Sequence, residues 1–256
     1  MSESPQETFL SHLFELRDRL VRSLVAVGLV FIPTFFYASE LYDLLAAPLV
    51  ANLPKGTTLI ATNVISPFIV PLKITLMAAF LVALPIVLYQ VWAFVAPGLY
   101  SHEKKMVLPL VVSSTLLFVA GVAFCYFFVF GQVFAFIQSF APKSITAAPD
   151  IEAYLSFVLS MFIAFGATFE VPVAVVVLAR MGIVTIEKLK EWRGYFIVLA
   201  FVVAAIITPP DVVSQLSLAI PMCLLYELGI VAAKVFIKNT QSPEAKAAAE
   251  ADAAKP

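Results

Sequence analysis

Long apolar runs dominate the pattern of hydrophobic and polar positions along the chain. A helix needs about 20 apolar residues to cross a hydrocarbon core of about 30 Å. Six runs reach or approach that length, and none shows the ten-residue alternation of a membrane β-barrel. They are residues 20–37, 69–95, 107–136, 154–179, 195–208 and 212–233. We therefore predict an all-α integral membrane protein with six transmembrane helices, the fifth of them short at about 21 Å.

Composition supports this class and excludes others. Hydrophobic residues make up 62% of the chain and charged residues 13%, with a net charge of -1 and a mean hydropathy of +0.99. A soluble domain is about 45–50% apolar and about 25% charged. A soluble enzyme and a nucleic-acid-binding protein are therefore disfavoured. The first run is not read as a cleaved signal peptide, because Tyr37-Ala38-Ser39 matches a cleavage site poorly.

Basic residues are distributed unevenly between the two sides that six spans define. Thirteen of the 16 Lys and Arg residues fall in the amino-terminal segment, in the loops near residues 101 and 189, and in the tail. Only Lys55, Lys73 and Lys143 fall on the opposite side. Cytoplasmic segments of membrane proteins are enriched in Lys and Arg, so we predict that both termini lie in the cytoplasm.

The spans form one predicted membrane domain, residues 1–238. Residues 8–22 are amphipathic, and we expect them to lie along the cytoplasmic interface before the chain turns into the membrane. The outer loop 38–66 contains a short helical pattern that Pro48 interrupts. Residues 239–256 are rich in Ala, Glu and Lys and predict a disordered cytoplasmic tail.

Glu170 lies inside the fourth run, near mid-membrane by its distance from Arg180. Ionisable groups at that depth are costly and are usually functional. Pro172 removes a backbone donor and frees the carbonyl of Thr168, so a polar pocket is expected there. The alternative is a structural glutamic acid that is hydrogen-bonded to another helix.

Three further carboxylates have ordinary structural explanations. Glu15 precedes Arg19 by four residues, which suits an ion pair within one helix. Glu103 stands beside Lys104 in a basic loop, where a solvated carboxylate is the default. Asp211 follows a Thr-Pro-Pro turn and can cap the sixth helix.

Catalytic signatures are missing from the sequence. We find no H-E-x-x-H, no G-x-S-x-G, no P-loop and no metal-spaced cluster of His and Cys. The two cysteines, Cys125 and Cys223, lie inside apolar runs. We therefore expect a protein without catalytic residues, bound metal or cofactor.

Several ordered motifs, taken together, resemble the TatC family, the multispanning components of the twin-arginine protein translocase. They are HLFELRDRL at 12–20, YQVWAFVAPGLY at 89–100 with HEK at 102–104, FG at 165–166, FEVP at 169–172, TPPD at 208–211 and SQ at 214–215. The resemblance covers residues 12–233, which is nearly the whole chain.

The resemblance implies a six-helix, glove-shaped protein in the bacterial cytoplasmic membrane. It implies recognition of paired-arginine signal peptides and export of folded proteins by the proton-motive force. The implied partners are single-span proteins of the TatA and TatB type and, in the complex, further copies of the chain. The implied site residues are Glu15, Arg17, Phe94 and Glu103 for the signal peptide, Glu170 on the concave face, Thr208, Asp211 and Gln215 for partner docking, and Pro48 in the outer cap.

A second hypothesis remains open at this stage. A proton-coupled transporter of small solutes would also explain Glu170. Such transporters usually show internal repeats, and inspection of this sequence reveals none.

Overall fold

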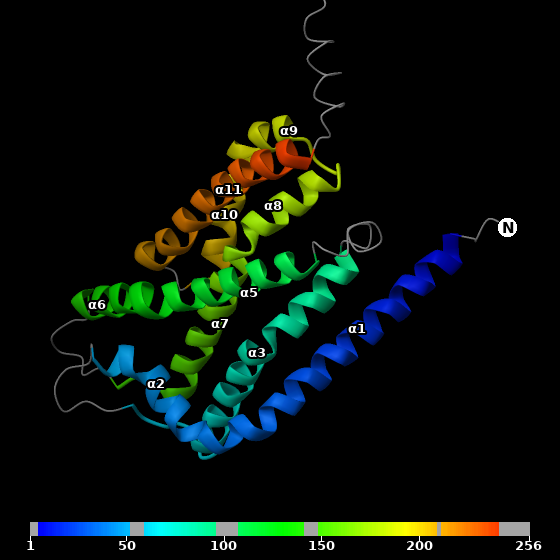
Figure 1. Ribbon diagram of the computed structural model, residues 1–256. Helices are drawn as coiled ribbons and strands as arrows, with labels where there is room; N and C mark the ends of the chain where they lie inside the picture. Colours follow the sequence, from blue (N-terminus) through cyan, green and yellow to red (C-terminus); the bar gives the residue numbers. More distant parts are fainter. Residues whose placement is uncertain (1–4, 52–58, 96–106, 141–147, 209–210, 241–256) are drawn as a thin grey trace, which may run out of the picture.

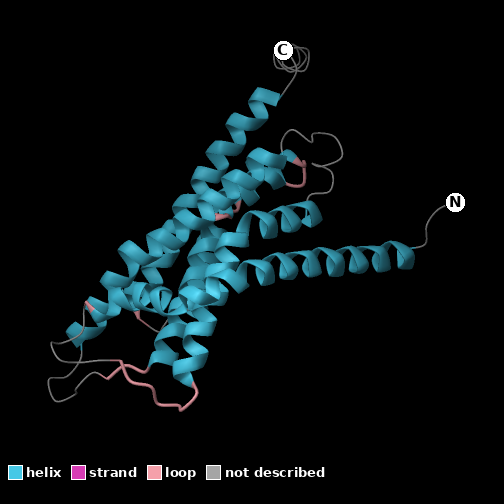
Figure 2. Ribbon diagram, turned by 60° about the horizontal axis from the view of Figure 1, so that its bottom comes forward, coloured by secondary structure: helices cyan, strands magenta, loops and turns pink. Residues whose placement is uncertain are grey.

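The structure, a computed structural model, describes residues 5–51, 59–95, 107–140, 148–208 and 211–240 (Figure 1). Within these ranges the chain is almost entirely helical, as Figure 2 shows. The α-helices are α1 (Pro5–Thr34), α2 (Ala38–Val50), α3 (Ser66–Val95), α5 (Val107–Phe124), α6 (Phe130–Phe140), α7 (Ile151–Phe169), α8 (Val171–Arg180), α9 (Ile186–Glu191), α10 (Arg193–Ile207) and α11 (Val212–Thr240). A 3-10 turn (Phe35–Tyr37) joins α1 to α2, and a π-helical turn (Cys125–Val129) joins α5 to α6.

Neighbouring helices pack as antiparallel, crossing or parallel pairs. Helix α1 packs along α3, α5 crosses α7, and α8 packs along α11. In Figure 1 the start of α1, the end of α3, the start of α5 and the end of α11 lie toward the upper right. Helix α2, the end of α6 and the start of α7 lie toward the lower left. The helix ends that the basic residues assign to the cytoplasm therefore lie at one end of the molecule, and those assigned to the outer side lie at the other end.

Five helical segments of the described chain are long and apolar enough to cross a bilayer. Helix α10 is a shorter apolar helix of 15 residues, or about 22 Å at the usual rise per residue. The six predicted spans are thus present, and the fifth is short, as expected. A helix shorter than the hydrocarbon core requires local thinning of the bilayer or a protein surface at its end.

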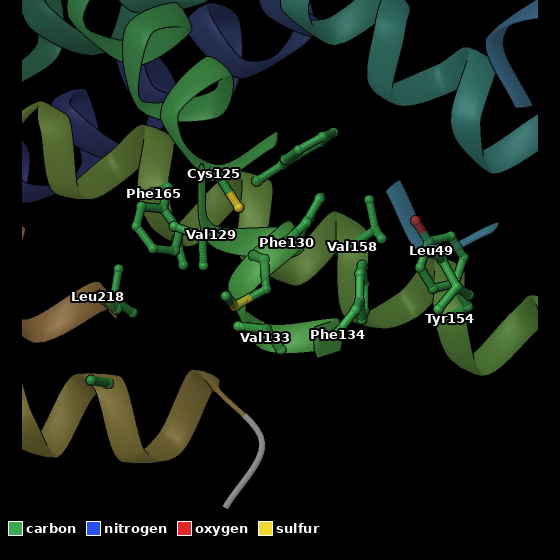
Figure 3. Close-up of a cluster of buried hydrophobic side chains, with 14 of the residues drawn as sticks. Leu49, Cys125, Val129, Phe130, Val133, Phe134, Tyr154, Val158, Phe165 and Leu218 are labelled. Atoms are coloured by element: carbon green, nitrogen blue, oxygen red, sulfur yellow. The ribbon is translucent and has the colours of Figure 1, made fainter. Parts of the chain in front are cut away.

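The largest buried cluster surrounds the π-helical turn (Figure 3). It includes Leu49 of α2, Tyr154 and Phe165 of α7, and Leu218 of α11. The turn and the first residues of α6 supply its centre, namely Cys125, Val129, Phe130, Val133 and Phe134. The extra residue of a π turn shifts the face that the following helix presents. The sequence pattern predicted one uninterrupted helix over 107–136 and missed this turn.

Two glycines allow α5 and α7 to approach closely. A Cβ atom at Gly121 would lie 2.5 Å from the carbonyl oxygen of Phe165, and one at Gly166 would overlap the ring of Phe118. Small residues let helix backbones come together where lipid supplies no hydrophobic driving force. These contacts fix the position of α7, and with it the position of Glu170.

The structure corrects three sequence-based expectations. Helix α1 runs without a turn from Pro5 to Thr34, so the amphipathic and apolar parts form one rod. Helix α2 continues through Pro48 to Val50, because a proline near the end of a short helix removes only one internal hydrogen bond. Helix α11 extends to Thr240, two residues into the predicted tail, and the rest of the tail lies outside the described residues.

Candidate binding sites on the helical frame

A charged cluster lies where α1 meets α3. Both Nε and Nη2 of Arg19 donate to Oε1 of Glu15, at 2.9 and 2.6 Å. Nη1 of Arg19 lies 3.4 Å from Oε1 of Gln90 on α3. The ion pair that the four-residue spacing predicts is therefore present, and it also reaches the neighbouring helix. Glu15 keeps 41% of its side chain exposed, so it remains accessible from outside.

Phe94 lies one helical turn beyond the contact that joins α3 to α1, and Glu15 lies one turn before that contact on α1. Helices α1 and α3 are antiparallel, and the contact between Arg19 and Gln90 sets their register. Four residues toward the start of α1 is Glu15, and four residues toward the end of α3 is Phe94, an equal rise along each helix. Phe94 is half-buried. The structure therefore places two of the four predicted signal-peptide residues within one helical turn of the contact between α1 and α3.

Of the other two predicted residues, Arg17 lies within the described part of the chain and Glu103 lies outside it. Arg17 is exposed, pairs with Asp18 at 2.8 Å, and places its guanidinium 5.3 Å from the centre of the Phe14 ring. Its side chain therefore lies in the same exposed turn as Glu15. Glu103 falls outside the described residues, in the segment that follows α3.

Glu170 lies at the break between α7 and α8. Helix α7 ends at Phe169 and α8 begins at Val171, so the helix is interrupted beside Pro172, which cannot donate to the Thr168 carbonyl. Both carboxylate oxygens of Glu170 are buried and reach no hydrogen-bond partner among the described residues. The Ser114 hydroxyl of α5 faces the carboxyl group without completing such a bond.

Ser114 itself belongs to a buried polar pair that the sequence analysis missed. Its Oγ accepts a hydrogen bond of 2.8 Å from Nε1 of Trp92 on α3. Ser114 is fully buried, and Trp92 is 7% exposed. Trp92, Ser114 and Glu170 thus place polar groups of α3, α5 and the α7–α8 break together. A serine inside an apolar run is too common to have pointed to this arrangement.

Helix α2 is held on the outer side by two tyrosines. Tyr126 donates a hydrogen bond of 2.7 Å to the carbonyl of Leu44, and Tyr154 donates one of 2.6 Å to the carbonyl of Leu45. Pro48 has no N–H, so it leaves the carbonyl of Leu44 without its usual helical donor. Tyr126 therefore supplies the donor that Pro48 removes from the Leu44 carbonyl.

The two outer segments are also tied to each other. Asp150 accepts from the backbone N–H groups of Glu152 and Ala153, at 3.1 and 3.0 Å, and from the Thr62 hydroxyl at 2.7 Å. These donors lower the pKa of Asp150, with the Ala153 N–H and the Thr62 hydroxyl as the leading causes. Lys73 of α3 pairs with Glu152 of α7 at 3.2 Å.

The α10–α11 hairpin satisfies most of the polar groups predicted for partner docking. Thr208 is buried and donates to the Ala204 carbonyl at 2.8 Å. Gln215 donates to the Phe201 carbonyl at 3.3 Å. Asp211 caps α11 by accepting from the Ser214 N–H at 2.7 Å, as the sequence predicts. Thr208 and Gln215 therefore each have a hydrogen-bond acceptor within the chain, and their role in partner docking stays a prediction.

The described residues contain no group of three His, Cys, Asp or Glu side chains placed to hold a metal ion. Their polar positions gather at the inner end of α1 and α3, at Glu170 and along the outer segments. The fold and these positions define a class, a multi-pass helical membrane protein with polar sites at one membrane face and at mid-depth.

Comparison with known proteins identifies the family. The family model for the Sec-independent protein translocase protein (TatC) matches residues 11–221. The TatC protein of Haemophilus influenzae is 50% identical over 230 residues, 90% of each chain. The TatC protein of Escherichia coli K12 is 47% identical over 244 residues, 95% of each chain. A crystal structure of the twin-arginine translocase receptor TatC matches with a TM-score of 0.75 at 41% identity, covering 88% of this chain and 98% of that chain.

The chain therefore belongs to the TatC family of Sec-independent protein translocase proteins. It is a multi-pass protein of the bacterial inner membrane and a component of a protein translocase. The resemblance, the fold class and the translocase function predicted from the sequence are confirmed. The alternative, a proton-coupled transporter of small solutes, is not favoured.

Proposed function

We propose that this chain is the receptor for paired-arginine signal peptides and the core scaffold of the translocase. In this role it exports folded proteins across the membrane by the proton-motive force, and it acts by binding rather than by catalysis. The observation that carries the proposal is the accessible carboxylate of Glu15, which is paired with Arg19 at the contact that joins α1 to α3, one helical turn from Phe94. The crystal structure of the twin-arginine translocase receptor TatC gives independent support for a receptor role.

A carboxylate at this position suits a guanidinium ligand. Arginine can donate two parallel hydrogen bonds to one carboxylate, whereas lysine acts as a point charge. Glu103 follows α3 in the sequence and supplies the second proposed carboxylate. Arg17 lies in the same turn of α1 as Glu15, but its side chain points to another face of the helix, where it pairs with Asp18.

An exposed ion pair contributes only about 0.2–1 kcal/mol. Most of the binding energy must therefore come from the apolar segment of the signal peptide, which meets Phe94 at the membrane boundary. The carboxylates then supply selectivity more than affinity. Changes to the carboxylates should therefore reduce the preference for arginine over lysine, and changes to the apolar contact at Phe94 should reduce binding.

The test is crosslinking of Arg-Arg and Lys-Lys signal peptides to variants at matched protein levels. Glu15→Ala and Glu103→Ala should reduce the preference for Arg-Arg more than they reduce total binding. Glu191→Ala removes an exposed carboxylate of α9, away from the site, and serves as the control. An unchanged preference in both site variants would exclude the two-carboxylate site.

We further propose that single-span partners of the TatA and TatB type dock on the α10–α11 hairpin. Helix α10 is short for a bilayer, so a partner helix at its end would cover the mismatch. An amide has further donor and acceptor positions, so Gln215 can bind a partner while it donates to Phe201. A crosslinker at the half-buried Gln215 should trap such a partner, with the buried Thr208 as a secondary position, and capture of lipid alone would oppose docking here.

Glu170 is proposed as the polar group of the concave face, available to a hydrogen-bond donor of the cargo or of a partner. Several copies of the chain are proposed to assemble in the working complex. Both proposals follow the family resemblance, and the buried unpartnered carboxylate supports the first.

A further inference from the structure

The carboxylate that the proposed function assigns to the signal peptide is already occupied by a guanidinium. Arg19 donates both Nε and Nη2 to the same oxygen of Glu15, Oε1. The arginine side chain is 21% exposed and the glutamate side chain 41% exposed. A guanidinium from outside the chain would therefore meet a carboxylate that is accessible but not free.

The third contact of Arg19 ties this pair to α3. Its Nη1 lies 3.4 Å from Oε1 of Gln90, whose side chain is buried. Gln90 and Phe94 are four residues apart on α3 and so share one face of that helix. The Arg19 guanidinium thus lies between the two helices, next to the position proposed for the signal peptide.

We propose that Arg19 is an internal competitor of the signal arginine, an autoinhibitory contact that must open before Glu15 can bind its ligand. This inference rests on the proposed signal-peptide site. In the empty receptor Arg19 satisfies the Glu15 carboxylate. In the occupied receptor the incoming guanidinium takes the place of Arg19, which turns away on its long and flexible side chain.

Competition of this kind has a simple thermodynamic consequence. Opening the Glu15–Arg19 pair costs the same free energy whichever cation follows, so the pair weakens every cationic ligand by one common factor. Ion pairs of this exposure correspond to a factor of about 1.5 to 5 in an equilibrium constant. A ligand that does not use Glu15 should not be affected at all.

The experiment measures binding of three fluorescent signal peptides to the full chain in nanodiscs. The peptides are identical except for an Arg-Arg, Lys-Lys or Gln-Gln pair. Arg19→Gln should tighten Arg-Arg and Lys-Lys binding by the same factor, about 1.5 to 5, and leave Gln-Gln binding unchanged. The gain should disappear when Glu15→Gln is combined with Arg19→Gln, because the coupling requires the carboxylate.

Arg22→Gln is the matched control. It removes the same charge from an exposed position of the same helix, three residues further on. It should tighten binding less than Arg19→Gln does, and by an amount that does not depend on Glu15. If Arg19→Gln lowers the amount of folded protein, Arg19→Lys keeps the charge and should give a smaller gain in the same direction.

The possible outcomes separate this inference from the site on which it rests. If Glu15→Gln alone leaves Arg-Arg binding unchanged, the proposed site is wrong. Suppose that Glu15→Gln weakens Arg-Arg binding but Arg19→Gln tightens it no more than Arg22→Gln does. The proposal that Arg19 competes with the signal arginine is then wrong, and the proposed binding site at Glu15 is retained. A gain that persists in the Glu15→Gln background also contradicts the proposed competition.

Discussion

Two residues of this chain show what depth in the membrane does to a polar side chain. Glu15 lies at the boundary, keeps much of its surface exposed and has a partner of opposite charge. Glu170 lies at the α7–α8 break with both carboxylate oxygens buried and unpartnered among the described residues. Buried polar groups without partners are costly, and such groups in native proteins usually mark function.

Substitutions at Glu170 should separate shape from chemistry. Glu170→Gln keeps the size of the side chain and one carbonyl oxygen, so folded protein should accumulate as in the parent chain. Glu170→Ala also creates a cavity beside Ser114, so it should reduce export further than Gln does. The measurement is export of a reporter cargo at matched protein levels. Glu187→Ala, an exposed position of α9, is the control. If the Gln and Ala variants both export normally, Glu170 has only a structural role.

At the scale of elements, apolar runs predict where helices occur but not how they contact one another. Lipid and protein core are equally apolar, so a span carries little sign of which face is buried. The six spans and the missing backbone donor at Pro172 could therefore be predicted from the sequence. The π-helical turn, the continuity of α1 and the bond between Trp92 and Ser114 could not, because they depend on the packing of distant segments.

The attachment of α2 illustrates a contact between elements that one proline makes possible. Tyr126→Phe should remove the donor to the Leu44 carbonyl and lower the free energy of unfolding by about 1 kcal/mol. The same change should cost less in a Pro48→Ala background, because the introduced alanine provides a backbone N–H for that carbonyl. Thermal unfolding in detergent measures both effects. Tyr37→Phe, at an exposed position, is the control. Equal costs in the two backgrounds would contradict the link between Pro48 and Tyr126.

The link between the outer segments should depend on pH. The pKa of Asp150 is lowered in the folded chain, so its ionised form favours the folded link. This contribution is fully present above the ordinary pKa of an aspartate and is lost as the pH falls through the lowered value. The protection of the Thr62 and Ala153 amides against hydrogen exchange, corrected for the intrinsic pH dependence of amide exchange, should therefore fall in acid. Asp150→Asn should abolish that loss of protection, and Asp43→Asn, at an exposed position of α2, should not. A loss of protection in acid that persists in Asp150→Asn would assign the effect to another group.

At the scale of the whole molecule, the distribution of basic residues and the arrangement of the helices indicate the same orientation in the membrane. The start of α1, α9 and the end of α11 lie at the end of the molecule that sequence assigns to the cytoplasm (Figure 1). The helices that run between the two ends differ in length, with 15 residues in α10, 30 in α3 and 29 in α11. Uneven helices produce the open arrangement that the resemblance to the TatC family implies.

Cysteine labelling in intact cells tests this polarity. In a chain without Cys125 and Cys223, an outside reagent should label cysteines at positions 55 and 143 and should not label one at 190. Position 190 serves better than 189, because Leu189 is only 4% exposed and would resist labelling on either side. The same reagent should label position 190 in permeabilised cells. Labelling of position 190 from outside would reverse the assignment.

Because α1 is one continuous helix, a tilt at one of its ends displaces the other end. Helix α1 packs along α3 and passes at its outer end into the 3-10 turn Phe35–Tyr37, a natural pivot. Glu15 stands 19 residues from Thr34, so the arm from pivot to carboxylate is about 28 Å long. A tilt of about 10° would then move Glu15 by about 5 Å at right angles to this arm, while the residues beside the pivot hardly move. A change of tilt at the 3-10 turn would therefore move Glu15 relative to Gln90 and Phe94, although the turn lies at the opposite end of α1.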